Sequence, residues 1–275
     1  MTGRIYVSMT RIKEWYNSNY LYFTFFVICM YFCWRFHSRQ SDSEVIYAEF
    51  VAKYGSYTVA NVFGWIKDRF IADFGWSSRQ IINFFASIFL LFPRLWGICN
   101  ALLCTLAGWS IGKLFNFKGI EFQVLALLSV FIYNHWITFS AGWLLGTIAY
   151  TWSSYMVLIA AQILWNRGYE KNRLQYSILL LCVAYAANEE LTAIGLFFIL
   201  PVVAWAKRDC ARMVCLLQTI VVLEIIWVAF CPGNRSRLSA ETGRWFPEFA
   251  KFSILQKMQL GFSVTMGKIW LAASV

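Results

Sequence analysis

Residues 122–166 of the sequence contain no Asp, Glu, Lys or Arg. This stretch is too long for one membrane-spanning helix, and Ser140-Ala141-Gly142 marks a break between two helices. Further apolar runs that could form helices occupy residues 15–34, 81–92, 95–112, 174–187, 191–206 and 211–230. The pattern predicts an all-α, polytopic transmembrane helical bundle with about seven to nine membrane segments. We expect one integral membrane domain over residues 1–275, in which residues 35–80 form an outer loop with short helices.

The composition supports this class and argues against two others. The chain is 60% hydrophobic and 14% charged, whereas an average soluble domain carries about 25% charged residues. Its net charge of +10 comes from basic residues scattered between apolar runs, which argues against nucleic-acid binding and for contact with anionic lipid headgroups. The eight cysteines have no CxxC spacing, and two histidines are too few for a typical zinc site. We expect the cysteines to pack as small apolar residues.

The distribution of Lys and Arg among the short loops predicts the orientation. The basic loops are residues 113–120, 166–173 and 207–212, and the turns between them at 136–147 and 188–190 have no basic residue. By the positive-inside rule, the basic loops and the N-terminus face the cytoplasm, in a multi-pass protein of the cytoplasmic (inner) membrane. Basic residues before the first apolar run, and no small-residue cleavage site after it, predict an uncleaved signal anchor.

This orientation requires that residues 81–92 do not cross the membrane separately. Either they lie at the outer interface, or they continue through Pro93 into residues 95–112 as one kinked helix. Both arrangements remain open from the sequence.

The predicted orientation gathers polar residues from distant parts of the chain at the outer face. They are Asp42, Glu44, Arg79, Tyr150, Trp152, Asn188, Glu189, Glu190, Asn234, Arg235 and Arg237. Adjacent acids between two apolar helices are costly unless they meet water, a partner or a ligand. A carboxylate that deprotonates a hydroxyl, together with arginines that balance charge on a departing phosphate, suits group transfer from a lipid-linked phosphate donor.

Each piece also has a plainer interpretation, which stays open. Asp42-Ser43-Glu44 could be only a helix N-cap, and Arg235 and Arg237 could only anchor to lipid phosphate. Tyr150 and Trp152 could be interfacial belt residues. Outer carboxylates could hold a divalent cation, but Asp42 and Glu44 alone do not specify one, and no other cofactor is indicated.

The order of these short motifs resembles a known family. The motifs are Asp42-Ser43-Glu44, Trp76 to Arg79, Tyr150-x-Trp152, Asn188-Glu189 and Pro232-Gly233-Asn234-x-x-Arg237. Over residues 20–240 their order resembles a bacterial multi-pass membrane family of uncharacterised function. That family is distantly similar to glycosyltransferases of the GT-C fold, which use polyprenyl-phosphate sugars.

The resemblance implies an outward-facing active site with Asp42 as general base and Glu44 as the second candidate. Arg79 and Arg237 would face the donor phosphate, with Arg235 beside them, while Asn188 and Glu189 would line the pocket. The chain departs from the family in having Ser43 between its acids and Ser78 before Arg79. It is also shorter than such proteins usually are, which is typical of a truncated, divergent or inactive relative.

We therefore expect a membrane glycosyltransferase, or an inactive or truncated relative, that moves a sugar from a polyprenyl-phosphate donor to a cell-envelope glycan at the outer face. Its partners would be the lipid bilayer, the donor and a glycan acceptor. Two alternatives stay open from the sequence. One is a transporter or flippase of a lipid-linked glycan that uses Glu189, Glu190 and Glu224 as an ion path. The other is a non-catalytic membrane partner subunit.

Overall fold

The computed structural model describes residues 20–37, 42–117, 119–141, 144–245, 247–260 and 262–263. Within these ranges the regular elements are all helical, which confirms the predicted all-α class. A first helix spans Tyr20–Phe36. The elements after it are α2 (Asp42–Tyr54), α3 (Val59–Phe74), α4 (Gln80–Leu91), α5 (Pro93–Leu114), α6 (Ile120–Ala141), α7 (Leu144–Gly146), the π-helix η1 (Thr147–Thr151), α8 (Trp152–Trp165), α9 (Gly168–Lys171), α10 (Arg173–Ala187), α11 (Glu190–Ala206), the 3₁₀ helix η2 (Arg208–Cys210), α12 (Ala211–Phe230), α13 (Pro232–Trp245) and the 3₁₀ helix η3 (Pro247–Lys251).

Three helical stretches of the described chain are long and apolar enough to cross a membrane: Pro93–Leu114, Leu144–Trp165 and Arg208–Phe230. At 1.5 Å per residue, a helix of this length measures about 33 Å, slightly more than a hydrocarbon core of about 30 Å. Five further apolar helices are shorter: Tyr20–Phe36, Gln80–Leu91, Ile120–Ile132, Arg173–Ala187 and Glu190–Ala206. The expectation of helices able to span a membrane is thus confirmed, which indicates membrane association.

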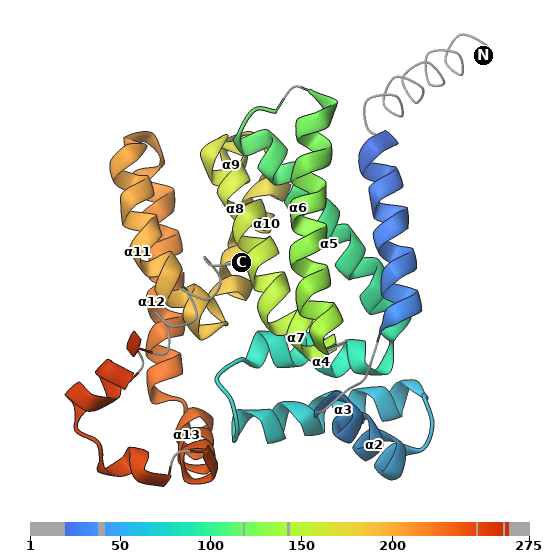
Figure 1. Ribbon diagram of the computed structural model, residues 1–275, viewed down its shortest axis with the longest axis vertical. Helices are drawn as coiled ribbons and strands as arrows, with labels where there is room; N and C mark the ends of the chain where they lie inside the picture. Colours follow the sequence, from blue (N-terminus) through green and yellow to red (C-terminus); the bar gives the residue numbers. More distant parts are fainter. Residues whose placement is uncertain are drawn as a thin grey trace.

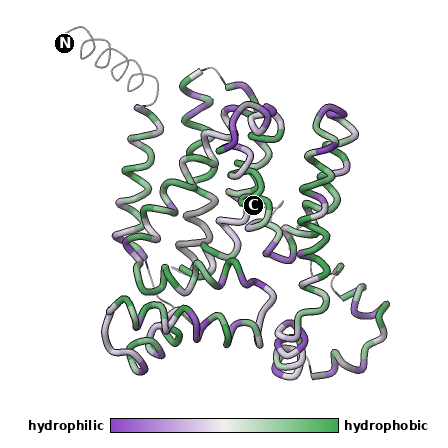
Figure 2. The backbone as a smooth tube through the Cα atoms, turned by 180° about the vertical axis from the view of Figure 1, so that it is seen from behind, coloured by the Kyte–Doolittle hydropathy of each residue, from purple (hydrophilic) through white to green (hydrophobic). Residues whose placement is uncertain are grey.

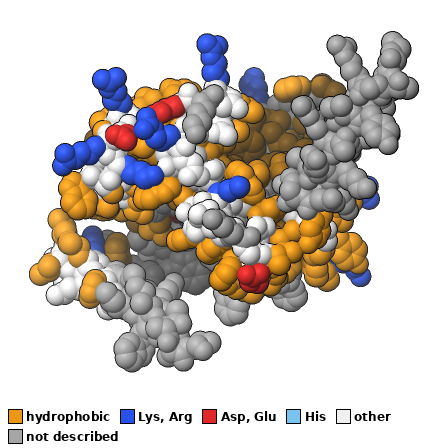
Figure 3. All heavy atoms as spheres, turned by 90° about the horizontal axis from the view of Figure 1, so that it is seen from above, with side chains coloured by type: hydrophobic (Ala, Val, Ile, Leu, Met, Phe, Trp, Pro, Cys, Tyr) orange, Lys and Arg blue, Asp and Glu red, His pale blue; other side chains and the backbone are white. Residues whose placement is uncertain are grey.

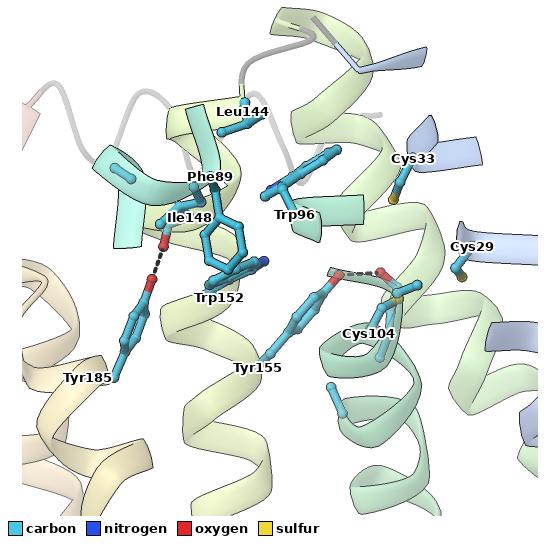
Figure 4. Packing of buried hydrophobic residues seen from close by; sticks show 14 of the residues in the cluster. Cys29, Cys33, Phe89, Trp96, Cys104, Leu144, Ile148, Trp152, Tyr155 and Tyr185 are labelled. Carbon is cyan, nitrogen blue, oxygen red and sulfur yellow. Dashed lines mark hydrogen bonds between the residues drawn. The ribbon is translucent and has the colours of Figure 1, made fainter. Parts of the chain in front are cut away.

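The long helices pack side by side around two apolar cores. One core joins the first helix, α4, α5 and α8, with Trp96 and Tyr155 fully buried at its centre. Figure 4 shows Tyr155 between Trp152 and Cys104, with Cys29 and Cys33 on the neighbouring helix. The second core joins α8, α10, α11 and α12. Six of the eight cysteines are buried as free thiols, as expected for small apolar side chains.

The two ends of the bundle are built from different elements (Figure 1). The turns after α5, α8 and α11 lie at one end, together with the start of the first helix. Helices α2, α3, α4, α7 and α13 lie at the other. The three basic loops therefore share one end, and a view onto that end shows lysine and arginine side chains around it (Figure 3). The tube coloured by residue hydropathy shows apolar residues along the helices between the two ends and also on the short helices at the α3 end (Figure 2).

Helix α4 answers the question left open for residues 81–92. It has 12 residues, about 18 Å of helix, and is therefore too short to cross a bilayer alone. Phe92, with φ −120° and ψ 68°, interrupts the helical backbone before Pro93 begins α5. Helix α4 lies across the end of the bundle (Figure 1). This favours the first alternative, in which residues 81–92 lie at one end of the bundle, over one kinked helix that includes residues 95–112.

Candidate functional site

The loop between α3 and α4, residues 75–79, is the point where distant segments meet. The N-terminus of α13 packs directly on this loop through Gly233. A Cβ atom at Gly233 would overlap the backbone nitrogen of Ser77 and lie 2.7 Å from the carbonyl carbon of Trp76. Only a glycine permits so close a backbone approach, so packing against the loop requires Gly233 at the centre of the Pro232-Gly233-Asn234 motif.

Ser78 is the most connected residue of the loop, and it is fully buried. Its N–H donates to Oδ1 of Asn234 (3.1 Å), and Nδ2 of Asn234 donates back to the Ser78 hydroxyl (3.0 Å). The hydroxyl donates to Oε1 of Glu190 (3.3 Å), and the Ser78 carbonyl accepts from Nε1 of Trp227 (3.0 Å). One serine thus ties the loop to α11, α12 and α13.

Asn188, in the turn between α10 and α11, supplies the missing cap of α4. Its Oδ1 accepts the backbone N–H groups of Ile81 (3.0 Å) and Ile82 (3.1 Å). The local N-cap residue, Arg79, provides no side-chain hydrogen bond to α4. Nδ2 of Asn188 donates to Oε2 of Glu224 in α12 (3.2 Å). Asn188 therefore caps the N-terminus of α4 from a distant turn, whereas a helix is normally capped by a residue next to it in the sequence.

Arg79 is held in a partly buried ion pair. Its Nε donates to Oε2 of Glu190 (2.7 Å), and its guanidinium carbon lies 5.1 Å from the ring centre of Tyr150. Oε1 of Glu189 is 3.6 Å from the same guanidinium, while Oε2 of Glu189 caps α11 by accepting from the backbone N–H of Thr192 (2.8 Å).

The ion pair keeps both partners charged. Burial by itself would raise the pKa of Glu190, but the hydrogen bond and positive charge of Arg79 outweigh it, so the pKa lies below its ordinary value. Burial by itself would lower the pKa of Arg79, but Glu190 raises it above its ordinary value.

A cavity of about 660 Å³ opens beside this network. Its polar and aromatic lining comes from α2, α3, the 75–79 loop, α4, η1 and α13. It comprises Glu49, Arg69, Asp73, Trp76, Ser77, Arg79, Asn83, Tyr150, Arg237 and Arg244. Arg237, Ala240 and Arg244 are three and four residues apart, so α13 presents one face to the cavity.

The charges around the cavity are unevenly compensated. Arg69 pairs with Asp73 (2.5 Å) and Glu49 (3.5 Å), and the charge of Arg69 opposes the rise in the pKa of Asp73 that burial causes. Arg79 is paired with Glu190. Within the part of the chain that the structure describes, Arg237 has no carboxylate at ion-pair distance. Four arginines and two acids line the cavity, and two further acids, Glu189 and Glu190, contact Arg79 from behind the lining.

Seven of the predicted site residues come together here. Arg79, Tyr150 and Arg237 line the cavity. Asn188, Glu189, Glu190 and Asn234 form the hydrogen-bonded layer behind Arg79 and the loop.

Four predicted residues lie elsewhere or outside the description. Trp152 is buried in the core, where its Nε1 donates to Oδ1 of Asn100 (2.8 Å), so it does not line the cavity. Glu44 is exposed on α2, and Arg235 is exposed on α13, both outside the lining. Asp42 is the first residue of α2, and its side chain lies outside the described residues.

The sequence-based interpretation missed several residues of the site. Glu49, Arg69, Asp73 and Arg244 line the cavity, and Ser78 organises the loop. Two spacings carried a signal: Arg69 and Asp73 are four apart on one helix, and Arg237 and Arg244 are seven apart on another. Nothing comparable marks Ser78, whose side chain contacts only distant segments.

No family model, curated protein or solved structure matches this chain. Among the described residues, no group of three His, Cys, Asp or Glu side chains is placed to hold a metal ion. The fold and the site together define a helical protein with helices apolar enough to span a membrane and an arginine-lined cavity at one end.

Proposed function

We propose that this protein is a membrane glycosyltransferase, or an inactive relative of one, that uses a polyprenyl-phosphate sugar. The acceptor would be a cell-envelope glycan at the outer face of the inner membrane. One observation carries the proposal: Arg79 and Arg237, far apart in sequence, line a single cavity that also contains Glu49 and Asp73. Planar guanidinium groups suit phosphate, and a carboxylate suits proton removal from a hydroxyl.

The proposed reaction assigns different tasks to the two arginines. Arg237 contacts the donor phosphate directly, because no carboxylate among the described residues competes for it. Arg79 is fixed by Glu190 and adds positive potential beside Tyr150. The acceptor hydroxyl attacks the anomeric carbon as the bond from that carbon to the phosphate oxygen breaks. Polyprenyl phosphate leaves with the bonding electrons, and a carboxylate takes the hydroxyl proton.

The base would be one of the acids of α2. Asp42 and Glu44 are the candidates that the family resemblance implies. Among the acids of α2 whose side chains are described, Glu49 lines the cavity and Glu44 does not, so we propose Glu49 ahead of Glu44. Glu49 lies 3.5 Å from Arg69, so its charge is only weakly compensated there, whereas Asp73 has the shorter contact with that arginine.

The proposed orientation places the cavity outside. The basic loops lie at the end of the bundle opposite α2, α3 and α13 (Figure 1). If those loops are cytoplasmic, as the positive-inside rule favours, the cavity faces away from the cytoplasm, with the N-terminus inside. The proposed seven to nine membrane segments would then include the shorter apolar helices other than α4, as well as the three long ones.

The contacts of Glu189, Glu190 and Glu224 favour the transferase over a transporter. Glu190 is paired with Arg79, Glu189 caps α11, and Glu224 accepts from Asn188. Each carboxylate proposed for an ion path therefore has a structural partner.

Arg237→Ala should weaken binding of a short-chain polyprenyl phosphate by about 10- to 100-fold, the equivalent of losing one charge-assisted hydrogen bond of about 1.5–3 kcal/mol. Titration of the detergent-purified protein measures this. Arg235→Ala is the matched control, since it removes the same charge from an exposed position on the same helix outside the cavity. Equal losses in both variants would indicate general charge attraction and would contradict a phosphate site at Arg237.

A further inference from the structure

Helix α3 has two faces of different character. Trp65 and Asp73 are buried, and Arg69 and Asp73 line the cavity. A second face, about 120° around the helix, carries an exposed row at intervals of three or four residues: Val59, Phe63, Lys67, Phe70 and Phe74. The four apolar members are 74%, 68%, 49% and 43% exposed, and Ile71 extends the row with 61%.

A contiguous row of this kind needs a partner. Single exposed apolar residues are common on protein surfaces, but a connected row rimmed by polar residues marks a contact surface. Helix α3 is not a membrane span, because its 16 residues include Lys67, Asp68, Arg69 and Asp73. It lies across the end of the bundle rather than along the long helices (Figure 1).

The row continues into the outer surface of a candidate membrane span. The ring of Phe74 lies 5.5 Å from the ring of Trp227 in α12. On α12, Leu223, Ile226 and Phe230 are exposed around Trp227. A partner that covers the apolar surface of α12 would therefore meet the α3 row at Phe74, and for a membrane span that partner is lipid hydrocarbon.

The composition of the row also fits a lipid surface. Lys67 lies between Phe63 and Phe70, and a lysine can extend its ammonium group to headgroup phosphates while its stem stays in apolar surroundings. Aromatic residues on one face with a basic residue beside them are typical of helices that lie in the membrane interface.

We infer that α3 is an interfacial helix whose Val59–Phe74 row inserts into the leaflet at the cavity end of the bundle. The occupant of this surface is lipid, not a second protein. Because Arg69 and Asp73 project from the other face of the same helix, the cavity lies at headgroup depth, where an amphiphilic anion can enter from the bilayer. This membrane contact does not depend on the proposed transferase activity.

Photocrosslinking to lipid tests the inference on the full chain. The photoreactive residue p-benzoylphenylalanine replaces Phe63 or Phe70, and the purified protein is reconstituted in vesicles of phosphatidylethanolamine and phosphatidylglycerol with alkyne-tagged acyl chains. Leu223, exposed on α12, is the reference position, and Ala48, exposed on α2, is the control. We expect lipid adducts at 63 and 70 at least about fivefold above those at 48, and similar to those at 223.

Three results would overturn the inference. The first is adduct formation at 63 and 70 no higher than at 48. The second is a crosslink from these positions to another protein chain in place of lipid. The third is an absence of adducts at 223, which would remove α12 from the bilayer and the continuity with it. Two photoreactive positions are used so that misfolding of one variant does not decide the result. The adduct yield requires no transferase activity, so this test and the donor-binding test can fail separately.

Discussion

Arg79→Ala should destabilise the folded protein by about 3–5 kcal/mol, the largest effect expected for any single substitution in the site. The change leaves Glu190 and Glu189 without their cation, and both carboxylates are largely buried, with 23% and 4% of their side chains exposed. Thermal unfolding of the purified protein, followed by a thiol-reactive fluorophore, measures the loss, because six cysteines become reactive only when the protein opens.

Arg237→Ala is the matched control for this prediction. It removes the same charge from the same cavity but breaks no ion pair among the described residues, so it should leave the melting temperature nearly unchanged. Arg79→Ala combined with Glu190→Gln should recover part of the stability, since the uncompensated charge is removed with the arginine. Equal melting temperatures for the two alanine variants would show that the Arg79–Glu190 pair does not stabilise the protein.

Asn188→Ala should have the second largest effect. It removes the one oxygen that accepts from the N–H groups of both Ile81 and Ile82 at a buried helix end, at a cost of about 1–3 kcal/mol. It also removes the donor to Glu224. The loss should appear as a lower melting temperature and as faster amide exchange at the start of α4.

A second asparagine cap in the chain provides the comparison. Asn172 caps α10 by accepting from the backbone N–H of Leu174 (2.8 Å), at an exposed helix start where water can replace the side chain. Asn172→Ala should therefore cost only about 1 kcal/mol. If Asn188→Ala proves no more harmful than Asn172→Ala, then Asn188 does not hold α4 in the way the structure shows.

The sequence was a good guide to what depends on local pattern. Uncharged runs predict apolar helices because helix formation depends mainly on residues that are neighbours in the sequence. The break predicted at Ser140-Ala141-Gly142 coincides with the end of α6 at Ala141. Counting basic loops placed Arg79, Asn188 and Asn234 at one end of the bundle. That end is where the structure joins them.

The sequence was a poor guide to which face a residue occupies. Tyr150 lines the cavity, whereas Trp152, two residues later, is buried in the core against Asn100. Between them the backbone changes from the π-helix η1 to α8, a change in helical period that composition does not reveal. Glu44 and Glu49 are five residues apart on α2 and therefore project in different directions, so only Glu49 reaches the cavity.

Labelling from one side of the membrane tests most directly whether the arginines share one water-exposed cavity. Cysteines are introduced one at a time at three exposed positions, as Ser56→Cys, Ser239→Cys and Arg208→Cys. In the background protein the exposed Cys215 and the half-buried Cys99 are replaced by serine, and labelling uses a membrane-impermeant maleimide in right-side-out vesicles. We expect Ser56→Cys and Ser239→Cys to react in intact vesicles, and Arg208→Cys to react only after permeabilisation. Reaction of positions 56 and 239 from opposite sides would place the two halves of the cavity across the bilayer and contradict the account.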